Sequence, residues 1–184
     1  MIRFIGGLSR TGKSTFGAQI ARRDGLRLET DWLSARKPLH PDISGNPWDD
    51  QFNAWARLSV DYENRAWDAV STYIGSAVEE EADLTVIGSF QPGHVLTYPF
   101  DFEYRAVFFV DTKMSEHIVD DVFDRIGSPM SGWTSDEVRQ WGRFIDRRSE
   151  TIIRLGESLG AHIFDIGKMG MNDAQSHAAT VMGY

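Results

Sequence analysis

The stretch Gly7-Leu8-Ser9-Arg10-Thr11-Gly12-Lys13-Ser14 fills every fixed position of the pattern G-x-x-x-x-G-K-[ST]. An apolar run, residues 2–5, comes before it, and residues 13–23 carry apolar side chains at helical spacing. The sequence therefore predicts a buried strand, a glycine-rich loop and a helix that begins inside the loop. In such an arrangement the loop amides and the positive end of the helix favour the binding of a phosphate group.

The residues of this loop have separate roles in holding a nucleotide. Two glycines, Gly7 and Gly12, let the backbone wrap a phosphate, while Lys13 reaches the β- and γ-phosphates and Ser14 offers its hydroxyl to Mg²⁺. We therefore predict a site for ATP and Mg²⁺ that is made by Gly7, Ser9, Arg10, Thr11, Gly12, Lys13, Ser14 and Thr15. The alternative is a chance match in a glycine-rich turn, and the strand–loop–helix context argues against it.

Composition and charge set limits on the class of protein. The 184 residues are 41% hydrophobic and 25% charged with no cysteine, which is typical of one globular domain without a disulfide framework. No run approaches the ~20 apolar residues of a membrane helix. The formal net charge of −8 argues against a non-specific nucleic-acid binder, whose affinity rests on a basic surface. We expect a single domain over residues 1–184, with no secretion signal, no membrane partner and a cytoplasmic location.

Short apolar runs alternate with helical patterns along the rest of the chain, which indicates an α/β fold with a parallel sheet. Further strands are expected at residues 26–30, 84–88, 106–110 and 161–166, and further helices at residues 115–126, 135–159 and 172–182. Residues 49–81 repeat apolar side chains every three or four positions, which indicates one long helix or two. We expect the aromatic side chains of that stripe to lie in the core.

In element order, length and phosphate loop, the chain resembles the small P-loop kinases of the adenylate, shikimate and gluconate kinase group. That group includes chloramphenicol phosphotransferase and the kinase domain of polynucleotide kinase. The phosphate loop is the specific motif, and the remainder is a likeness of pattern. The resemblance implies a three-layer P-loop NTPase fold: a five-stranded parallel sheet in the order 2-3-1-4-5, helices on both faces and a lid. It also implies an acceptor-binding region at about residues 31–60 and a lid at about residues 125–148.

The resemblance implies roles for polar residues that follow the other strands. Asp31 comes just after the second strand, where the resembling kinases have an Asp that faces the acceptor hydroxyl and the Mg²⁺ shell; the alternative is a helix cap. Arg36 is close enough to Asp31 in the chain to hold an acceptor phosphate. Ser89 follows the third strand, at the edge where open α/β sheets bind their ligands. We interpret Asp111, after the fourth strand, as a helix cap.

Arginines surround the predicted lid. Arg125 precedes a turn-rich segment at residues 127–134, and Arg139, Arg143 and Arg147 share one face of the helix that follows. The resembling kinases place arginine here to neutralise charge on the moving phosphoryl group. We select Arg125 and Arg143 as catalytic candidates and Arg147 as a nucleotide contact. The alternative is a solvated helix face paired with neighbouring carboxylates.

Together these features predict an ATP-dependent kinase that transfers the γ-phosphoryl group of Mg-ATP to a hydroxyl of a small molecule. The acceptor classes that fit are a sugar or sugar acid, another metabolite, an antibiotic, or a nucleoside or nucleotide. The predicted catalytic residues are Lys13, Asp31, Arg125 and Arg143, the acceptor contacts are Asp31, Arg36 and Ser89, and the Mg²⁺ ligands are Ser14 and Asp31. Two alternatives stay open: a nucleic-acid-end or modified-base kinase, which the net charge opposes, and an ATP-binding regulatory protein without phosphotransfer.

Overall fold

A computed structural model describes residues 1–24, 26–29, 83–123 and 133–184, together with residues 64, 67, 70, 71, 74, 75 and 77–80. The predicted acceptor region at residues 31–60 lies outside the described residues, and so does the lid segment at residues 125–132. Three of the predicted site residues, Asp31, Arg36 and Arg125, therefore lie outside them as well.

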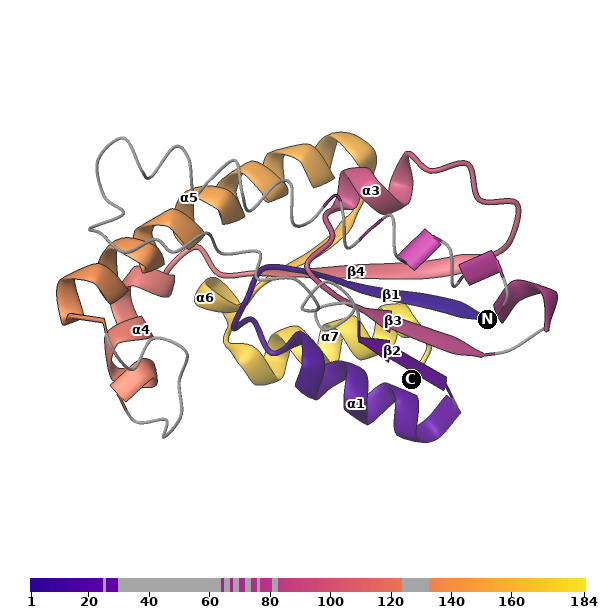
Figure 1. Ribbon diagram of the computed structural model, residues 1–184, viewed down its shortest axis with the longest axis horizontal. Coiled ribbons are helices and arrows are strands. Elements are labelled where there is room, and N and C mark those ends of the chain that lie inside the picture. Colours follow the sequence, from indigo (N-terminus) through magenta and orange to yellow (C-terminus); the bar gives the residue numbers. More distant parts are fainter. Residues whose placement is uncertain are drawn as a thin grey trace.

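Five parallel strands form one sheet in the order β2-β3-β1-β4-β5, as the resemblance implied (Figure 1). The strands are β1 (Ile2–Gly7), β2 (Leu26–Glu29), β3 (Leu84–Ile87), β4 (Tyr104–Val110) and β5 (His162–Asp165). The central strand β1 runs two residues beyond its predicted end, because Gly6 and Gly7 continue the ladder opposite Phe108 and Phe109. The strand β4 begins two residues before its predicted start, because Tyr104 already pairs with Ile2 of β1.

Helices cover both faces of the sheet, with α1 (Lys13–Asp24) and α7 (Met171–Met182) on one face (Figure 1). The core of that face joins Ile5, Val107 and Phe109 of the sheet to Phe16 of α1 and Ala178 of α7. On the other face lie α3 (Pro92–Leu96) and α5 (Ser135–Leu159). Its core also includes the buried side chains Trp67, Val70, Ile74 and Ala77, of which Val70 and Ile74 belong to the predicted stripe. The aromatic members of that stripe, at residues 52, 55 and 62, lie outside the described residues.

The long helix α5 has the bounds that the sequence predicts, because both of its ends carry strong local signals. Thr134 caps the N-terminus in a reciprocal capping box with Glu137, and the Thr134 N–H and hydroxyl bonds lower the pKa of the Glu137 carboxyl. Gly160 ends the helix in the left-handed conformation, with φ 69°. No described helix is long and apolar enough to cross a membrane.

Two short helices were not predicted: α3 and α6 (Ile166–Met169). Each is too short to show a helical repeat of apolar residues, and each depends on a local cap. In α3, Pro92 occupies the first turn and Gln91 forms a capping box with His94. In α6, the Asp165 carboxylate accepts a hydrogen bond from the Gly167 N–H.

The helix α4 (Met114–Phe123) is held at its N-terminus by a carboxylate from α5. Asp146 accepts hydrogen bonds from the Ser115 N–H at 3.3 Å and from the Ser115 hydroxyl at 2.5 Å. Gly142 allows this approach, because a Cβ there would stand 2.6 Å from the Ser115 Cα. Burial raises the pKa of the Asp146 carboxyl above its ordinary value, against the opposing effect of the Ser115 hydrogen bonds.

We expect Asp146→Asn to change how stability depends on pH. Because the pKa of Asp146 is raised by folding, its contribution to the free energy of unfolding is fully present below the unfolded pKa and is lost as pH rises through the folded pKa. An asparagine does not titrate: its amide oxygen can accept from the Ser115 N–H, and its NH2 group can donate to the Ser115 hydroxyl oxygen, which reverses that bond. In urea unfolding from about pH 3 to about pH 7, the variant should gain stability relative to wild type as pH rises. If the difference in free energy of unfolding between the variant and the wild type stays constant over this pH range, the pKa of Asp146 is not raised by folding.

Candidate nucleotide-binding site

The phosphate loop joins β1 to α1 at the carboxyl edge of the sheet. Three of its residues have left-handed backbone conformations: Gly7 with φ 118°, Arg10 with φ 63° and Gly12 with φ 76°. The neighbouring strands hold its start, because the Gly7 N–H donates to the Phe90 carbonyl at 2.9 Å and the Leu8 N–H donates to the Phe109 carbonyl at 3.1 Å. The loop is therefore fixed to the segments that follow β3 on one side and to β4 on the other.

The side chain of Lys13 lies inside this loop. Its Nζ donates to the Leu8 carbonyl at 2.5 Å, and the Thr11 hydroxyl donates to the same oxygen at 2.8 Å. Thr11 is fully buried, and only 5% of Lys13 is exposed. An ammonium group is thus placed at the centre of the loop, where an anionic ligand would find both the charge and the N-terminus of α1.

The remaining loop residues surround this centre. Ser14 and Thr15 lie in the first turn of α1 and are exposed, as is Ser9, while Arg10 is half-buried. The Ser14 hydroxyl is thus accessible, as a ligand of Mg²⁺ must be. The backbone of Gly12 touches α7, because Gln175 donates to the Gly12 carbonyl at 3.4 Å.

Polar residues follow β3 and β4 at the same edge of the sheet. Ser89 is buried, and the next residue, Phe90, binds the start of the phosphate loop through its carbonyl. Asp111 is fully buried, and its Oδ1 accepts from the Lys113 N–H at 2.9 Å, just before α4 begins. This bond closes the turn just before α4, whereas the first-turn N–H of Ser115 is bonded by Asp146, so the predicted cap of α4 is made by Asp146 and not by Asp111. The other carboxylate oxygen of Asp111, Oδ2, lies 2.7 Å from the Nε2 of His117, a partner that the sequence did not indicate.

A pocket of about 520 Å³ lies between the residues that follow β4 and those that follow β5. Its wall is fixed by Asp165, which accepts from the Thr112 N–H at 3.1 Å, the Thr112 hydroxyl at 2.6 Å and the Gly167 N–H at 3.1 Å. The lining residues are Asp111, Lys113, Glu116, His117, Ile166, Gly167 and Met171. Met171 also lies against Gly12, where a Cβ would collide with its sulfur, so the pocket adjoins the phosphate loop.

The arginines of α5 differ in their environment. Arg139 forms an exposed ion pair with Asp136 at 2.8 Å, as expected of a solvated helix face. Arg143 and Arg147 are exposed, and their assigned roles stay predictions. Arg148, which the sequence analysis did not select, is half-buried because it flanks the apolar stripe of α5. The spacing of the apolar residues along α5 could have predicted this, because Arg148 directly precedes the buried residue Ser149.

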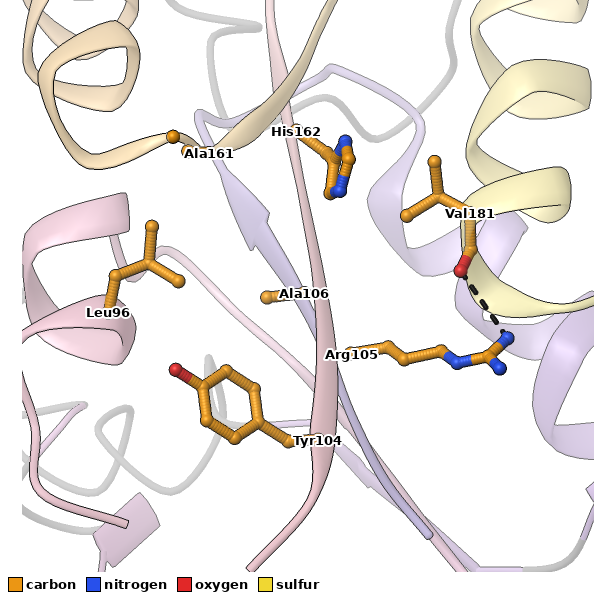
Figure 2. A pocket seen from close by; sticks show the side chains of 8 residues that line it. Leu96, Tyr104, Arg105, Ala106, Ala161, His162 and Val181 are labelled. Carbon is orange, nitrogen blue, oxygen red and sulfur yellow. Dashed lines mark hydrogen bonds between the residues drawn. The ribbon is translucent and has the colours of Figure 1, made fainter.

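A second pocket, of about 330 Å³, lies at the opposite, amino end of β4 and β5 (Figure 2). Arg105 projects from β4 toward α7 and donates to the Val181 carbonyl at 3.4 Å. A cation at the C-terminal end of a helix stabilises the helix dipole, so this arginine has a structural role. None of the predicted site residues that the structure describes lines this pocket.

Comparison with known proteins supports the fold. No protein-family profile matches the sequence, and no curated protein matches it. Among solved structures, shikimate kinase from Bacteroides thetaiotaomicron aligns over 100% of this chain and 99% of its own, with a TM-score of 0.57 and 13% identity. Deoxyadenosine kinase from M. mycoides with bound dATP aligns over 100% of both chains, with a TM-score of 0.50 and 12% identity. The chain has the α/β fold of the small P-loop kinases.

Proposed function

We propose that this protein is a kinase that transfers the γ-phosphoryl group of Mg-ATP to a hydroxyl group of a small molecule. The observation that carries the proposal is the phosphate loop, with a buried lysine at its centre and the end of a helix beside it. Phosphoryl transfer depends mainly on positioning and on electrostatic stabilisation of the phosphates, and this loop is suited to both. Such an enzyme would act in the cytoplasm, where ATP is supplied.

The nucleotide would lie along the carboxyl edge of the sheet. Lys13 and the loop amides would hold the phosphates, and the Ser14 hydroxyl would bind Mg²⁺, which neutralises phosphate charge when present. The pocket between the ends of β4 and β5 would receive the nucleoside. Its volume of about 520 Å³ falls within the usual range for small-ligand sites, and Met171 links it to Gly12 of the loop.

The acceptor would lie on the other side of the loop, near Ser89 and the predicted acceptor region. In the transfer step the acceptor oxygen bonds to the γ-phosphorus, the bond to the β–γ bridging oxygen breaks, and ADP leaves. We assign to Asp31 the orientation of the acceptor hydroxyl and the acceptance of its proton. We assign to Arg36 a contact with the acceptor, and to Arg125, Arg143 and Arg147 the neutralisation of phosphate charge by the lid.

ADP release from Mg-ATP tests this function. We expect release to be stimulated by one member of a panel of hydroxylated metabolites, antibiotics and nucleosides. In Asp31→Asn the stimulated rate should fall by about 10²-fold or more, because a positioned base contributes that much to a proton transfer. The control is Asp136→Asn, which removes a carboxylate whose side chain is 83% exposed, and it should retain the wild-type rate.

The two alternatives give different results in the same assay. A nucleic-acid-end kinase would respond to oligonucleotide ends, and its affinity for them would fall steeply with salt. An ATP-binding regulatory protein would bind ATP tightly and release ADP slowly, whatever acceptor is added. Slow release that ignores every acceptor and the Asp31→Asn change would contradict the kinase proposal.

A further inference from the structure

The first half of α5 projects beyond the sheet, and α4 packs against this projecting half (Figure 1). In the second half of α5, Gly156 lies against β5, where a Cβ would stand 2.1 Å from the Ile163 side chain. In the first half, Asp146 instead accepts hydrogen bonds from Ser115 of α4. We call α4 and residues 135–148 of α5 the arm. It lies past the carboxyl ends of the strands, at the edge that carries the phosphate loop.

The arm and the phosphate loop share one apolar core. Leu8, the second residue of the loop, is buried in a cluster with side chains from both helices of the arm: Met114, Ile118, Val138, Trp141, Phe144 and Ile145. The Leu8 carbonyl is also the acceptor of the Lys13 ammonium. The exposed residues Arg143 and Arg147 belong to the same part of α5, so the position of the arm sets their distance from a phosphate bound in the loop.

One residue at the end of β4 attaches both helices of the arm to the sheet. Asp111 follows the last residue of the strand and is fully buried. Its carboxylate holds α4, because Oδ1 accepts from the Lys113 N–H at 2.9 Å and Oδ2 lies 2.7 Å from the His117 Nε2. Its backbone holds α5, because the Ser149 hydroxyl accepts from the Asp111 N–H at 3.0 Å and donates to the Asp111 carbonyl at 2.8 Å.

Ser149 is suited to fixing the direction of α5 because its hydroxyl bonds in both directions. The residue is fully buried where α5 passes the end of β4. Buried backbone groups need partners, and here one hydroxyl serves an N–H and a carbonyl at once. The apolar contacts of the arm are non-directional, whereas these two bonds set a distance and an angle. About 9 Å of helix separates Ser149 from Arg143, so a tilt of about 6° at Ser149 would move Arg143 by about 1 Å.

We propose that Ser149 is a positioning residue for phosphoryl transfer: its two hydrogen bonds to the end of β4 fix the arm, and with it the arginines of α5, beside the phosphate loop. The inference rests on the proposed function, which assigns the neutralisation of phosphate charge to Arg143 and Arg147. The loop itself is held by its own N–H bonds to β4 and to the segment after β3. Loss of the Ser149 hydroxyl therefore affects the transfer step more than the binding of ATP.

The first test compares kcat for acceptor-stimulated ADP release with the Kd of Mg-ATP on the same samples. In Ser149→Ala, kcat should fall by about 10-fold to 10²-fold, because a misplacement of about 1 Å can cost that much, while the Kd changes far less. The matched control is Ile152→Val, which removes one methylene from a fully buried residue of α5 in the same core. It should also lower Tm, but it should keep the wild-type kcat at a temperature where every variant is folded.

A second test measures the position of the arm without using activity. The chain has no cysteine, so spin labels can be attached at Asp136→Cys on the arm and at His177→Cys on α7, both of which are exposed positions. About 20 Å of helix separates residue 136 from Ser149, so a tilt of about 6° moves the label by about 2 Å. Electron–electron double resonance should show the distance distribution shifted or broadened by this amount in Ser149→Ala, and unchanged in Ile152→Val.

Equal losses of kcat in the two variants, or a wild-type kcat in Ser149→Ala, would mean that Ser149 only stabilises the fold, and would overturn the inference. An unchanged distance distribution in Ser149→Ala would overturn it too, because the arm would then not depend on these two bonds. Each of these results leaves the kinase proposal standing. A wild type that transfers no phosphate to any acceptor would overturn both.

Discussion

Replacement of Lys13 by methionine is expected to lower kcat/KM for phosphoryl transfer by about 10²-fold to 10³-fold, the effect of removing one group that stabilises developing charge. The ammonium lies inside the loop, 2.5 Å from the Leu8 carbonyl, with 5% of the residue exposed. Methionine has a similar length and suits a buried place, so the fold should persist while the charge is lost. Steady-state kinetics and the Kd of Mg-ATP, measured on the same samples, would separate lost catalysis from lost binding.

Arg154→Met provides the control, because it removes a cation from an exposed position on α5. Its guanidinium donates one long hydrogen bond, 3.5 Å, to the neighbouring Thr151 hydroxyl. We expect its rate and its affinity for ATP to match the wild type. Equal losses in the two variants would mean that total charge, and not the position of Lys13, controls the activity, and would contradict the assignment of the loop.

The sequence was sufficient for the framework because its signals there are local. The loop from Gly7 to Ser14 fixes a strand before it and a helix after it, and α5 is bounded by a capping box at Thr134 and a left-handed glycine at Gly160. The strand order came from the resemblance that this loop carries, and the ladders on both sides of β1 confirm it. Strand ends were less accurate, since a ladder can continue through residues such as Gly6 that have no apolar side chain.

The pocket beside the loop could not be predicted from sequence because it depends on contacts between distant segments. Asp165 and Thr112 are brought together by the pairing of β4 with β5, and Gly167 meets Asp111 only in the folded chain. The same holds for the contact between Met171 and Gly12. Spacing along α5 likewise grouped Arg143 with Arg147 but did not reveal that Arg148 is the more buried.

Gly7→Ala is expected to lower the free energy of unfolding by about 3 kcal/mol or more, which combines backbone strain with overpacking. Gly7 has φ 118°, and a Cβ there would collide with the backbone of Phe109, which cannot move easily. Phe109 is fully buried in β4, and its carbonyl accepts the Leu8 N–H at 3.1 Å. For a chain of this length the loss corresponds to a fall in Tm of about 6–12 °C, measurable by differential scanning calorimetry.

Gly160→Ala separates the two causes, because Gly160 is also left-handed, with φ 69°, but a Cβ there would meet nothing within 4 Å. Its expected cost is about 1 kcal/mol, from the backbone conformation alone. If both variants lose the same free energy of unfolding, Gly7 is not in the close contact with the Phe109 backbone described above. Because Gly7 belongs to the core ladder and to the phosphate loop at once, its substitution should also weaken ATP binding, whereas Gly160→Ala should leave the Kd unchanged. We expect Gly7→Ala to lose both stability and ATP affinity, and Gly160→Ala to lose stability alone. That pair of results would show that the sheet sets the shape of the phosphate site.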